Sequence, residues 1–224
     1  MFGARELTKK YGKQNVLNGV NFELSAGKIV GLFGLNGSGK TTMFRILSGI
    51  DGDFKGELLK TDYEDVSYMS VENIYPIEMR IKDVLDFHKT FNPKQQTQAI
   101  LEELERIGVK KNKLLNNLST GLRQYFKFLL TVYSGTSVCL FDEPLTNLDV
   151  NLRNQIIKIL ISQASEDKLF IVSTHEIKEI DKIIDGFYVL KNGKLSEFFN
   201  AEDIVEQTGL SIEEFYKEQV NEKE

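Results

Sequence analysis

A glycine-rich segment carries the residue types that bind a chain of phosphates. It reads Gly34-Leu35-Asn36-Gly37-Ser38-Gly39-Lys40-Thr41 and matches G-x-x-x-x-G-K-[ST] at every fixed position. Glycines let successive backbone N–H groups curl around a phosphate, which residues with a Cβ do only at a cost. The Lys40 ammonium would face the phosphate oxygens, and the Thr41 hydroxyl would reach Mg²⁺. The spacing therefore predicts a site for a nucleoside triphosphate.

The residues on either side of this loop agree with it. Residues 28–33 are typical of a buried strand, and Met43, Leu47 and Ile50 recur at i, i+4 and i+7, which predicts a helix over 41–50. The N-terminus of a helix favours anions, so strand, loop and helix together indicate a phosphate site. A glycine-rich turn that matches the pattern by chance is the alternative, and the flanking residues argue against it.

A pair of carboxylates follows the apolar run 137–141. Asp142 ends this expected strand, where it would lie beside the loop and hold Mg²⁺ through water. Glu143 comes one residue later, at the exposed strand end, where it would polarise a water for attack on the γ-phosphate. An acidic strand end without chemistry is the alternative, and the phosphate loop upstream argues against it.

Five motifs in the expected order resemble those of the ATP-binding subunits of ABC transporters, and the resemblance covers the chain from end to end. Besides the phosphate loop and the Asp142-Glu143 pair, Leu118–Gln124 is similar to the family signature, usually Leu-Ser-Gly-Gly-Gln. Residues 143–149 resemble the run from the catalytic glutamate through the D-loop. Residues 173–176 resemble the segment of the switch histidine.

The resemblance implies a role for each of these motifs. Glu143 would be the catalytic base, His175 would hold phosphate, water and Glu143 together, and Tyr11 would stack on adenine. Lys40 would act in catalysis as well as in binding, and Thr41 and Asp142 would bind Mg²⁺. The implied nucleotide contacts are Tyr11, Gly34, Leu35, Asn36, Gly37, Ser38, Gly39, Lys40, Thr41, Thr42, Ser119, Thr120, Gly121 and Asp149.

The signature segment also has a physical interpretation. Ser119 would cap a helix that begins near Thr120, and Gly121 would leave its amides open to an anion. In the family, this helix end and the phosphate loop of the same chain lie far apart. The resemblance therefore implies a homodimer or a pseudo-symmetric heterodimer, with each ATP between the loop of one subunit and the signature of the other. For these residues alone, an ordinary capped helix over 118–132 is the alternative.

Two parts of the sequence depart from the family pattern. Val71 stands where the family has a glutamine that touches Mg²⁺ and relays the ATP state to the membrane partner, and Glu72 would offer an oxygen if the alignment shifts by one. Thr120 and Leu122 replace a glycine and the glutamine of the signature. We expect a working site that is slower than most.

The order of motifs predicts an α/β fold, a P-loop NTPase (RecA-like) domain that spans 1–224. A mixed-sheet core with an N-terminal antiparallel β subdomain would comprise 1–72 and 137–199, interrupted by a helical subdomain at 73–136 and followed by a helical extension at 200–224. Buried strands are expected at 137–141 and 169–172, and Asn192-Gly193 indicates a hairpin.

Composition narrows the class of protein further. The 224 residues carry a net charge of −5, which argues against a nucleic-acid-binding surface. No run of 18 apolar residues and no signal peptide is found, so we expect a cytoplasmic chain. The single cysteine, Cys139, suits a reducing compartment and a buried position. His88 lies on an apolar helix face, where packing is the more common role.

The resemblance implies an ATPase that drives a separate membrane permease, at the inner face of the membrane, in the style of the bacterial exporter-like (ABC-2-type) group. A groove near residues 72–90, with Ile74, Tyr75, Ile77 and Met79, would receive a short helix of the permease. The alternatives are a soluble ABC ATPase that acts on ribosomes or DNA and an unrelated P-loop kinase. The sequence does not identify the transported substrate.

Overall fold

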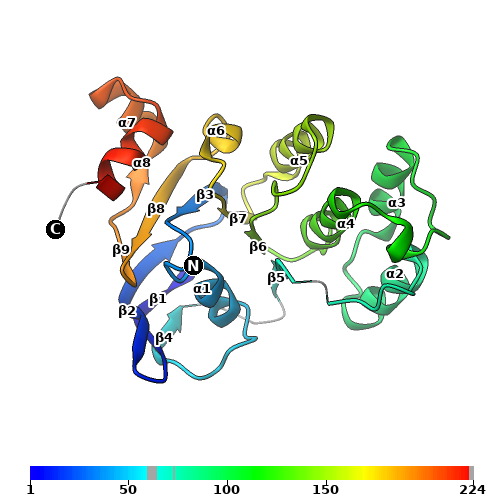
Figure 1. Ribbon diagram of the computed structural model, residues 1–224, viewed down its shortest axis with the longest axis horizontal. Coiled ribbons are helices and arrows are strands. Elements are labelled where there is room, and N and C mark those ends of the chain that lie inside the picture. Colours follow the sequence, from blue (N-terminus) through cyan, green and yellow to red (C-terminus); the bar gives the residue numbers. More distant parts are fainter. Residues whose placement is uncertain (60–64, 73, 222–224) are drawn as a thin grey trace.

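The structure is a computed structural model that describes residues 1–59, 65–72 and 74–221. Its central sheet is mixed, as the sequence predicts, with five neighbouring strands parallel and two short strands antiparallel to β8 (Figure 1). In spatial order, its strands are β10 (Phe199–Asn200), β8 (Gly186–Lys191), β3 (Lys28–Phe33), β7 (Leu169–Ser173), β6 (Val138–Asp142) and β5 (Val66–Met69), with β9 (Lys194–Leu195) paired to β8.

A second, antiparallel sheet forms from the N-terminal residues. Its strand order is β2 (Gln14–Leu24), β1 (Phe2–Tyr11) and β4 (Lys55–Leu59). In β2 the buried residues Val20, Phe22 and Leu24 alternate with exposed ones, and the apolar residues of β1 and β2 pack on the central sheet together with those of α1 (Lys40–Leu47). The mixed core and the antiparallel β subdomain of the predicted fold are therefore confirmed.

Helices cover the other face of the central sheet and extend beyond its edge. In Figure 1 the segment between β5 and β6 forms the helical end of the molecule, away from the antiparallel sheet. The helices after α1 are α2 (Ile81–Phe91), α3 (Thr97–Arg106), α4 (Thr120–Val132), α5 (Val150–Gln163), α6 (Ile177–Ile180), α7 (Ala201–Thr208) and α8 (Ile212–Asn221).

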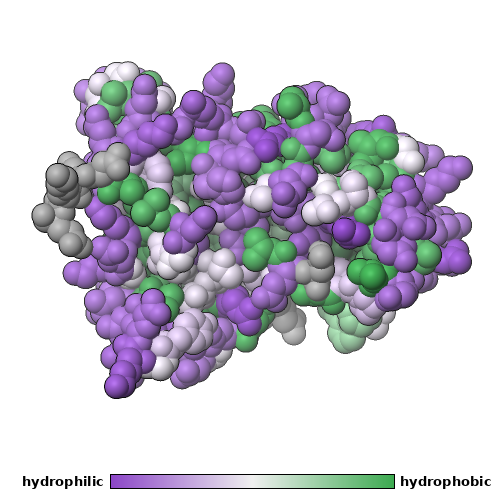
Figure 2. All heavy atoms as spheres, viewed as in Figure 1, coloured by the Kyte–Doolittle hydropathy of each residue, from purple (hydrophilic) through white to green (hydrophobic). Residues whose placement is uncertain are grey.

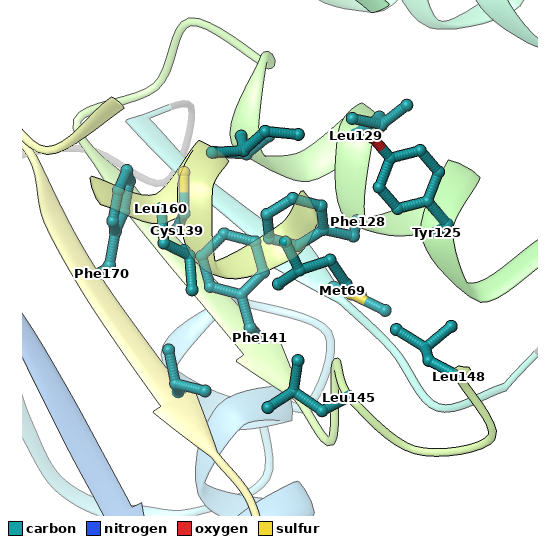
Figure 3. Close-up of a cluster of buried hydrophobic side chains, with 14 of the residues drawn as sticks. Met69, Tyr125, Phe128, Leu129, Cys139, Phe141, Leu145, Leu148, Leu160 and Phe170 are labelled. Atoms are coloured by element: carbon teal, nitrogen blue, oxygen red, sulfur yellow. The ribbon is translucent and has the colours of Figure 1, made fainter. Parts of the chain in front are cut away.

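The buried strands alternate between two apolar clusters, one on each face of the sheet. In β6, Cys139 and Phe141 face α4 and α5, while Val138 and Leu140 face α1 and the antiparallel sheet. Figure 3 shows the first cluster, where the Phe141 ring lies 5.2 Å from that of Phe128. Burial raises the pKa of the Cys139 thiol to about 11, as expected for a buried hydrophobe. Both faces are covered, which explains the continuous apolar runs in the sequence.

Several local predictions are confirmed by the backbone. Asp149 caps α5, since its Oδ1 accepts from the Leu152 N–H at 3.0 Å. Ser119 caps α4 by accepting from the Leu122 N–H at 3.2 Å. Asn192 and Gly193 adopt φ of 51° and 74°, the conformation that a tight hairpin turn requires.

The first helix is shorter than its periodicity predicts. It ends at Leu47, and Gly49 follows with φ of 82°, a left-handed conformation that stops a helix. Ile50 therefore lies outside the helix and is 57% exposed, so its predicted place on the buried face is wrong. No helix among the described ranges is long and apolar enough to cross a bilayer.

Candidate functional site

The phosphate loop connects β3 to α1, as predicted. Gly37 and Gly39 adopt φ of 80° and 110°, and a Cβ on Gly39 would lie 3.0 Å from the Val16 carbonyl oxygen of β2. Glycine is required at both positions because L side chains rarely adopt this conformation. The N-terminus of α1 has no side-chain cap. Its first N–H groups thus form a cradle suited to an anion.

Lys40 lies at the base of this cradle. Its Nζ donates to the carbonyl oxygens of Gly34 at 2.7 Å and Leu35 at 3.3 Å, and the residue is buried. Burial lowers the pKa of the ammonium, and the negative charges of Glu143 and Asp142 oppose that shift. A buried ammonium held only by carbonyls is ready to exchange them for charged phosphate oxygens, which bind it more strongly.

Asp142 collects three hydroxyl groups from three neighbouring elements. Its Oδ2 accepts from Thr41 at 2.7 Å and from Tyr68 at 3.2 Å, and its Oδ1 accepts from Ser173 at 2.6 Å. The carboxylate is 1% exposed. These contacts place an oriented carboxylate directly beside the first turn of α1. Together with the Thr41 hydroxyl, it supplies the hard oxygen donors that Mg²⁺ prefers.

Glu143 and His175 are brought together, as the sequence comparison with the family implied. The His175 Nδ1 lies 2.8 Å from Glu143 Oε2, and the same oxygen accepts the backbone N–H of His175 at 3.3 Å. Glu143 adopts φ of 51°, an uncommon conformation for a residue with a side chain. Such strain persists only where the surroundings hold it, and it is concentrated at functional sites.

The backbone of Glu143 is held from two sides. Its N–H donates to the Ser173 carbonyl oxygen at 3.0 Å, and its own carbonyl oxygen accepts from Gln124 Nε2 of α4 at 2.8 Å. The sequence reasoning did not assign roles to Gln124, Ser173 or Tyr68. Ser173 pairs with Asp142 in the parallel register of β6 and β7, so strand ends alone could have indicated it.

At the start of the signature segment, residues 119–121 make no hydrogen bond to the phosphate loop in the described structure, although Gln124 at its end contacts Glu143. Ser119 Oγ is occupied by its own helix, and a Cβ on Gly121 would lie 2.9 Å from the Asn147 carbonyl oxygen. Among the described residues, no hydrogen bond or ion pair joins 119–121 to residues 34–42. Asp149 is likewise engaged in capping α5. A single chain therefore assembles the loop, Asp142, Glu143 and His175, but not the signature.

Tyr11 ends β1 and is half exposed. Its hydroxyl donates to Asp51 Oδ2 at 3.0 Å, and Lys9 Nζ lies 4.9 Å from the centre of its ring. Lys9 also pairs with Asp51 at 2.8 Å. The hydrogen bond and the cation fix the orientation of an aromatic ring that is open to a stacking partner.

The first residues of the phosphate loop border a cavity. Leu35 and Asn36 line a cavity of about 400 Å³ with Gln14 and Asn192, and neither Tyr11 nor Glu143 lines it. Ser38 Oγ is buried and has no hydrogen-bond partner among the residues described. Gly37 and Ser38 also line this cavity, so it borders the phosphate loop, whereas Asp142, Glu143 and His175 do not line it.

Val71 and Glu72 stand at the position where the family has a glutamine. Val71 is 47% exposed, and Glu72 Oε1 lies 3.7 Å from Arg45 of α1 rather than beside Asp142. The carbonyl oxygens of both residues accept from Lys127 of α4. In this structure the Glu72 carboxylate is therefore paired with α1, and the role of the missing glutamine stays a prediction for either residue.

An apolar groove of about 700 Å³ opens on the helical end of the molecule. Figure 2 shows apolar atoms among the polar surface at the end that carries α2 and α3. Tyr75 and His88 are hydrogen-bonded in the groove, and burial lowers the pKa of His88. Ile77, expected here, instead lies beside a smaller cavity with Phe126 and Lys127. The groove is lined by Ile74, Tyr75, Pro76, Met79, Phe87, His88, Phe91 and Asn92.

Comparisons with known proteins agree on one family. A family model described as ABC transporter matches residues 17–146. An uncharacterized ABC transporter ATP-binding protein of Methanocaldococcus jannaschii is 31% identical over 204 residues, which cover 88% of this chain and 77% of that protein. The xylose/arabinose import ATP-binding protein XylG of Sulfolobus acidocaldarius is 27% identical over 228 residues, with 90% and 91% covered.

A solved structure shares the fold. It is titled as an ATP binding subunit of an ABC transporter and superimposes with a TM-score of 0.85 at 22% identity, covering 97% of this chain and 98% of that one.

Proposed function

The chain belongs to the ABC transporter family as one of its ATP-binding subunits, and we propose that Glu143 and His175 hydrolyse ATP that is held on residues 34–42. ATP-binding subunits of this family are ATPases coupled to transport, so the reaction class follows from membership. The assignment of residues to roles is supported above all by the 2.8 Å contact between His175 Nδ1 and Glu143 Oε2.

The triphosphate would lie along the N-terminus of α1. Lys40 would release the Gly34 and Leu35 carbonyl oxygens to contact the phosphates, and Tyr11 would stack on the base. Thr41 and Asp142 are the residues that would hold Mg²⁺, which would neutralise negative charge on the phosphates when bound. Two protein ligands suffice because Mg²⁺ in such sites keeps waters and phosphate oxygens.

Glu143 would accept a proton from the attacking water. Its side chain is 15% exposed, so it reaches solvent while Gln124 and Ser173 hold its backbone. His175 is 56% exposed on its side chain and orients the carboxylate through Nδ1. This arrangement positions a base at a strand end with little freedom to rotate, which favours in-line attack.

Replacing Glu143 by Gln tests this role. The amide cannot accept the proton, so we expect turnover to fall by about 100-fold or more while ATP affinity is kept. Steady-state phosphate release and equilibrium nucleotide binding measure the two quantities separately. Equal turnover in the two proteins would refute Glu143 as the base.

We also propose that two subunits complete each other's sites, as a homodimer or a pseudo-symmetric heterodimer. The observation in favour is that, among the described residues, no hydrogen bond or ion pair joins residues 119–121 to the phosphate loop, while Ser119 Oγ accepts from its own helix. Their helix N-terminus would meet the γ-phosphate on the loop of a partner subunit. Domain boundaries at 72, 136 and 199 belong to the same proposal, with the helical segment carrying the signature.

The groove on the helical end is the proposed docking site for a permease. Phe87 and Phe91, 52% and 75% exposed, flank an apolar depression that would accept one short helix of a membrane protein. Attachment there would hold the chain at the inner face of the membrane. Export is the proposed direction, because Leu118–Gln124 and residues 211–216 resemble the exporter-like group, although several relatives are named for import.

Tyr75→Arg and Phe91→Arg would test docking. We expect both to abolish co-purification of the permease from detergent-solubilised membranes and to leave the ATPase activity of the isolated subunit intact. Ile77→Arg is the control, since Ile77 is an exposed apolar residue of the same segment that does not line the groove. Unchanged co-purification of the Tyr75 and Phe91 variants would count against this surface.

A further inference from the structure

Lys127 is a buried cation held by main-chain oxygens. Its Nζ donates to the carbonyl oxygens of Ser70 at 2.9 Å, Val71 at 3.2 Å and Glu72 at 3.3 Å. The residue is 9% exposed, and no carboxylate lies within ion-pair distance of it among the described residues. An ammonium has three donors, so these three contacts satisfy it completely. Burying a charge in this way is costly unless every donor is used.

The three carbonyls belong to the segment that connects the nucleotide site to the groove. It follows β5, whose Tyr68 contacts Asp142, and it precedes Ile74 and Tyr75 of the groove. The Glu72 side chain lies 3.7 Å from Arg45 of α1. In the sequence, this segment therefore stands between a strand that contacts the carboxylate site and the first residues of the groove.

Lys127 stands on a helix that also contacts the catalytic strand end. Gln124, one turn earlier on α4, donates to the Glu143 carbonyl oxygen at 2.8 Å. The same helix begins at Ser119, the proposed contact to a partner's γ-phosphate. Through Gln124 and Lys127, α4 thus contacts the backbone of Glu143 and of residues 70–72. A helix is a rigid element that can carry a displacement from one of these contacts to the other.

We propose that Lys127 is a positioning residue that fastens residues 70–72 to α4, so that α4 and the groove move together when nucleotide binds. Since the contacts are made to main-chain oxygens, the link does not depend on the side chain at Val71. The groove's importance rests on the docking function proposed above. The link itself is a property of the isolated chain and is measured there.

A single tryptophan gives the measurement, because the chain has none of its own. Phe87→Trp places the probe in the groove, and a Glu143→Gln background keeps ATP intact. We expect Mg-ATP to change the fluorescence of this reporter. Adding Lys127→Met should reduce that change by about fivefold, with the Kd for ATP altered by less than about twofold.

Two further variants separate positioning from loss of structure. Lys158→Met removes an exposed lysine from α5 and should leave the response intact. Lys127→Arg keeps the charge and the donors and should retain most of it. Urea unfolding and the ATP titration report whether each variant is folded.

The proposal is overturned if Lys127→Met keeps the full response, if Lys158→Met loses as much, or if the parent reporter does not respond to ATP. A Lys127→Met protein that no longer binds ATP would also overturn it, because Lys127 would then support the fold of the site rather than the link. The fluorescence experiment contains no permease. Its outcome therefore does not depend on whether the docking experiment supports the groove as the permease site.

Discussion

The molecule has two helix N-termini of opposite design, those of α1 and α4. The N-terminus of α1 has no side-chain cap and is surrounded by Lys40, Asp142 and Glu143 of the same chain. The N-terminus of α4 is capped by Ser119, whose Oγ accepts from the Leu122 N–H of the same helix. Both are suited to anions by their unpaired N–H groups and dipoles.

The two helix ends therefore suit different parts of the proposed site. The N-terminus of α1 lies open beside the buried Lys40 and could bind phosphate within one chain. At the N-terminus of α4, Ser119 is already hydrogen-bonded to its own helix, and the proposed phosphate would come from a partner subunit. The proposed phosphate cradle is therefore complete within one chain, and the proposed signature contact is incomplete there. If the proposed dimer forms, the second becomes useful only against another subunit's first.

Lys40→Met should remove the charge from the complete cradle. We expect ATP affinity to fall by about 100-fold, because charge-assisted bonds to the phosphates are lost. Isothermal titration with ATP in the Glu143→Gln background measures this. Lys158→Met on α5 serves as the control and should bind normally. Native affinity in the Lys40 variant would show that the cradle at α1 is not the phosphate site.

Ser119→Arg should block the incomplete contact, lowering turnover by about tenfold or more without weakening ATP binding to the free subunit. Its mixture with Lys40→Met is the sharper measurement. If the signature acts across the dimer, each mixed dimer has one intact site, and a 1:1 mixture should regain about a quarter of native activity. No recovery on mixing would place both residues in the same site of one chain.

Ser119→Ala tests the cap itself. Loss of the bond from the Leu122 N–H should lower the free energy of unfolding by about 1 kcal/mol. Asp149→Ala, which removes the cap of α5, should cost a similar amount and serves as the comparison. Urea denaturation measures both. No destabilisation in the Ser119 variant would mean that this serine is not held as a cap in solution.

Asp51→Ala should loosen the aromatic ring at the edge of the complete cradle. Tyr11 loses its acceptor and Lys9 its 2.8 Å partner, so we expect ATP affinity to fall by about threefold. Inorganic tripolyphosphate has no base to stack, and its affinity should not change. Asp53→Ala, at a carboxylate that is 97% exposed, is the matched control. Equal loss for tripolyphosphate would assign Asp51 to the phosphates instead.

The buried strands and the phosphate loop could be predicted because their signals are local. Continuous apolar residues at 29–33 and 169–172 are typical of strands covered on both faces. The fixed positions from Gly34 to Thr41 reflect one backbone shape. The first helix was overestimated at Ile50, because periodicity continued past a glycine whose left-handed conformation ends the helix.

The contacts of Gln124 and Lys127 could not be predicted in this way. The pattern of α4 indicates which face is apolar, but it does not say which carbonyls a buried polar side chain will meet. Their partners lie 19 residues away at Glu143 and 55 to 57 residues away at 70–72. Such contacts depend on how the helical segment packs against β5 and β6.

By itself, the sequence determined the residue types of the site and the order of the elements that present them. The loop, the two carboxylates, the histidine and the capped signature are all visible there, because each follows from short-range geometry. Only the tertiary structure decided which groups meet: three hydroxyls on Asp142, His175 on Glu143, and Lys127 on the carbonyls of 70–72. These pairings join distant segments, and burial selects them because a polar group removed from water must find a partner inside the fold.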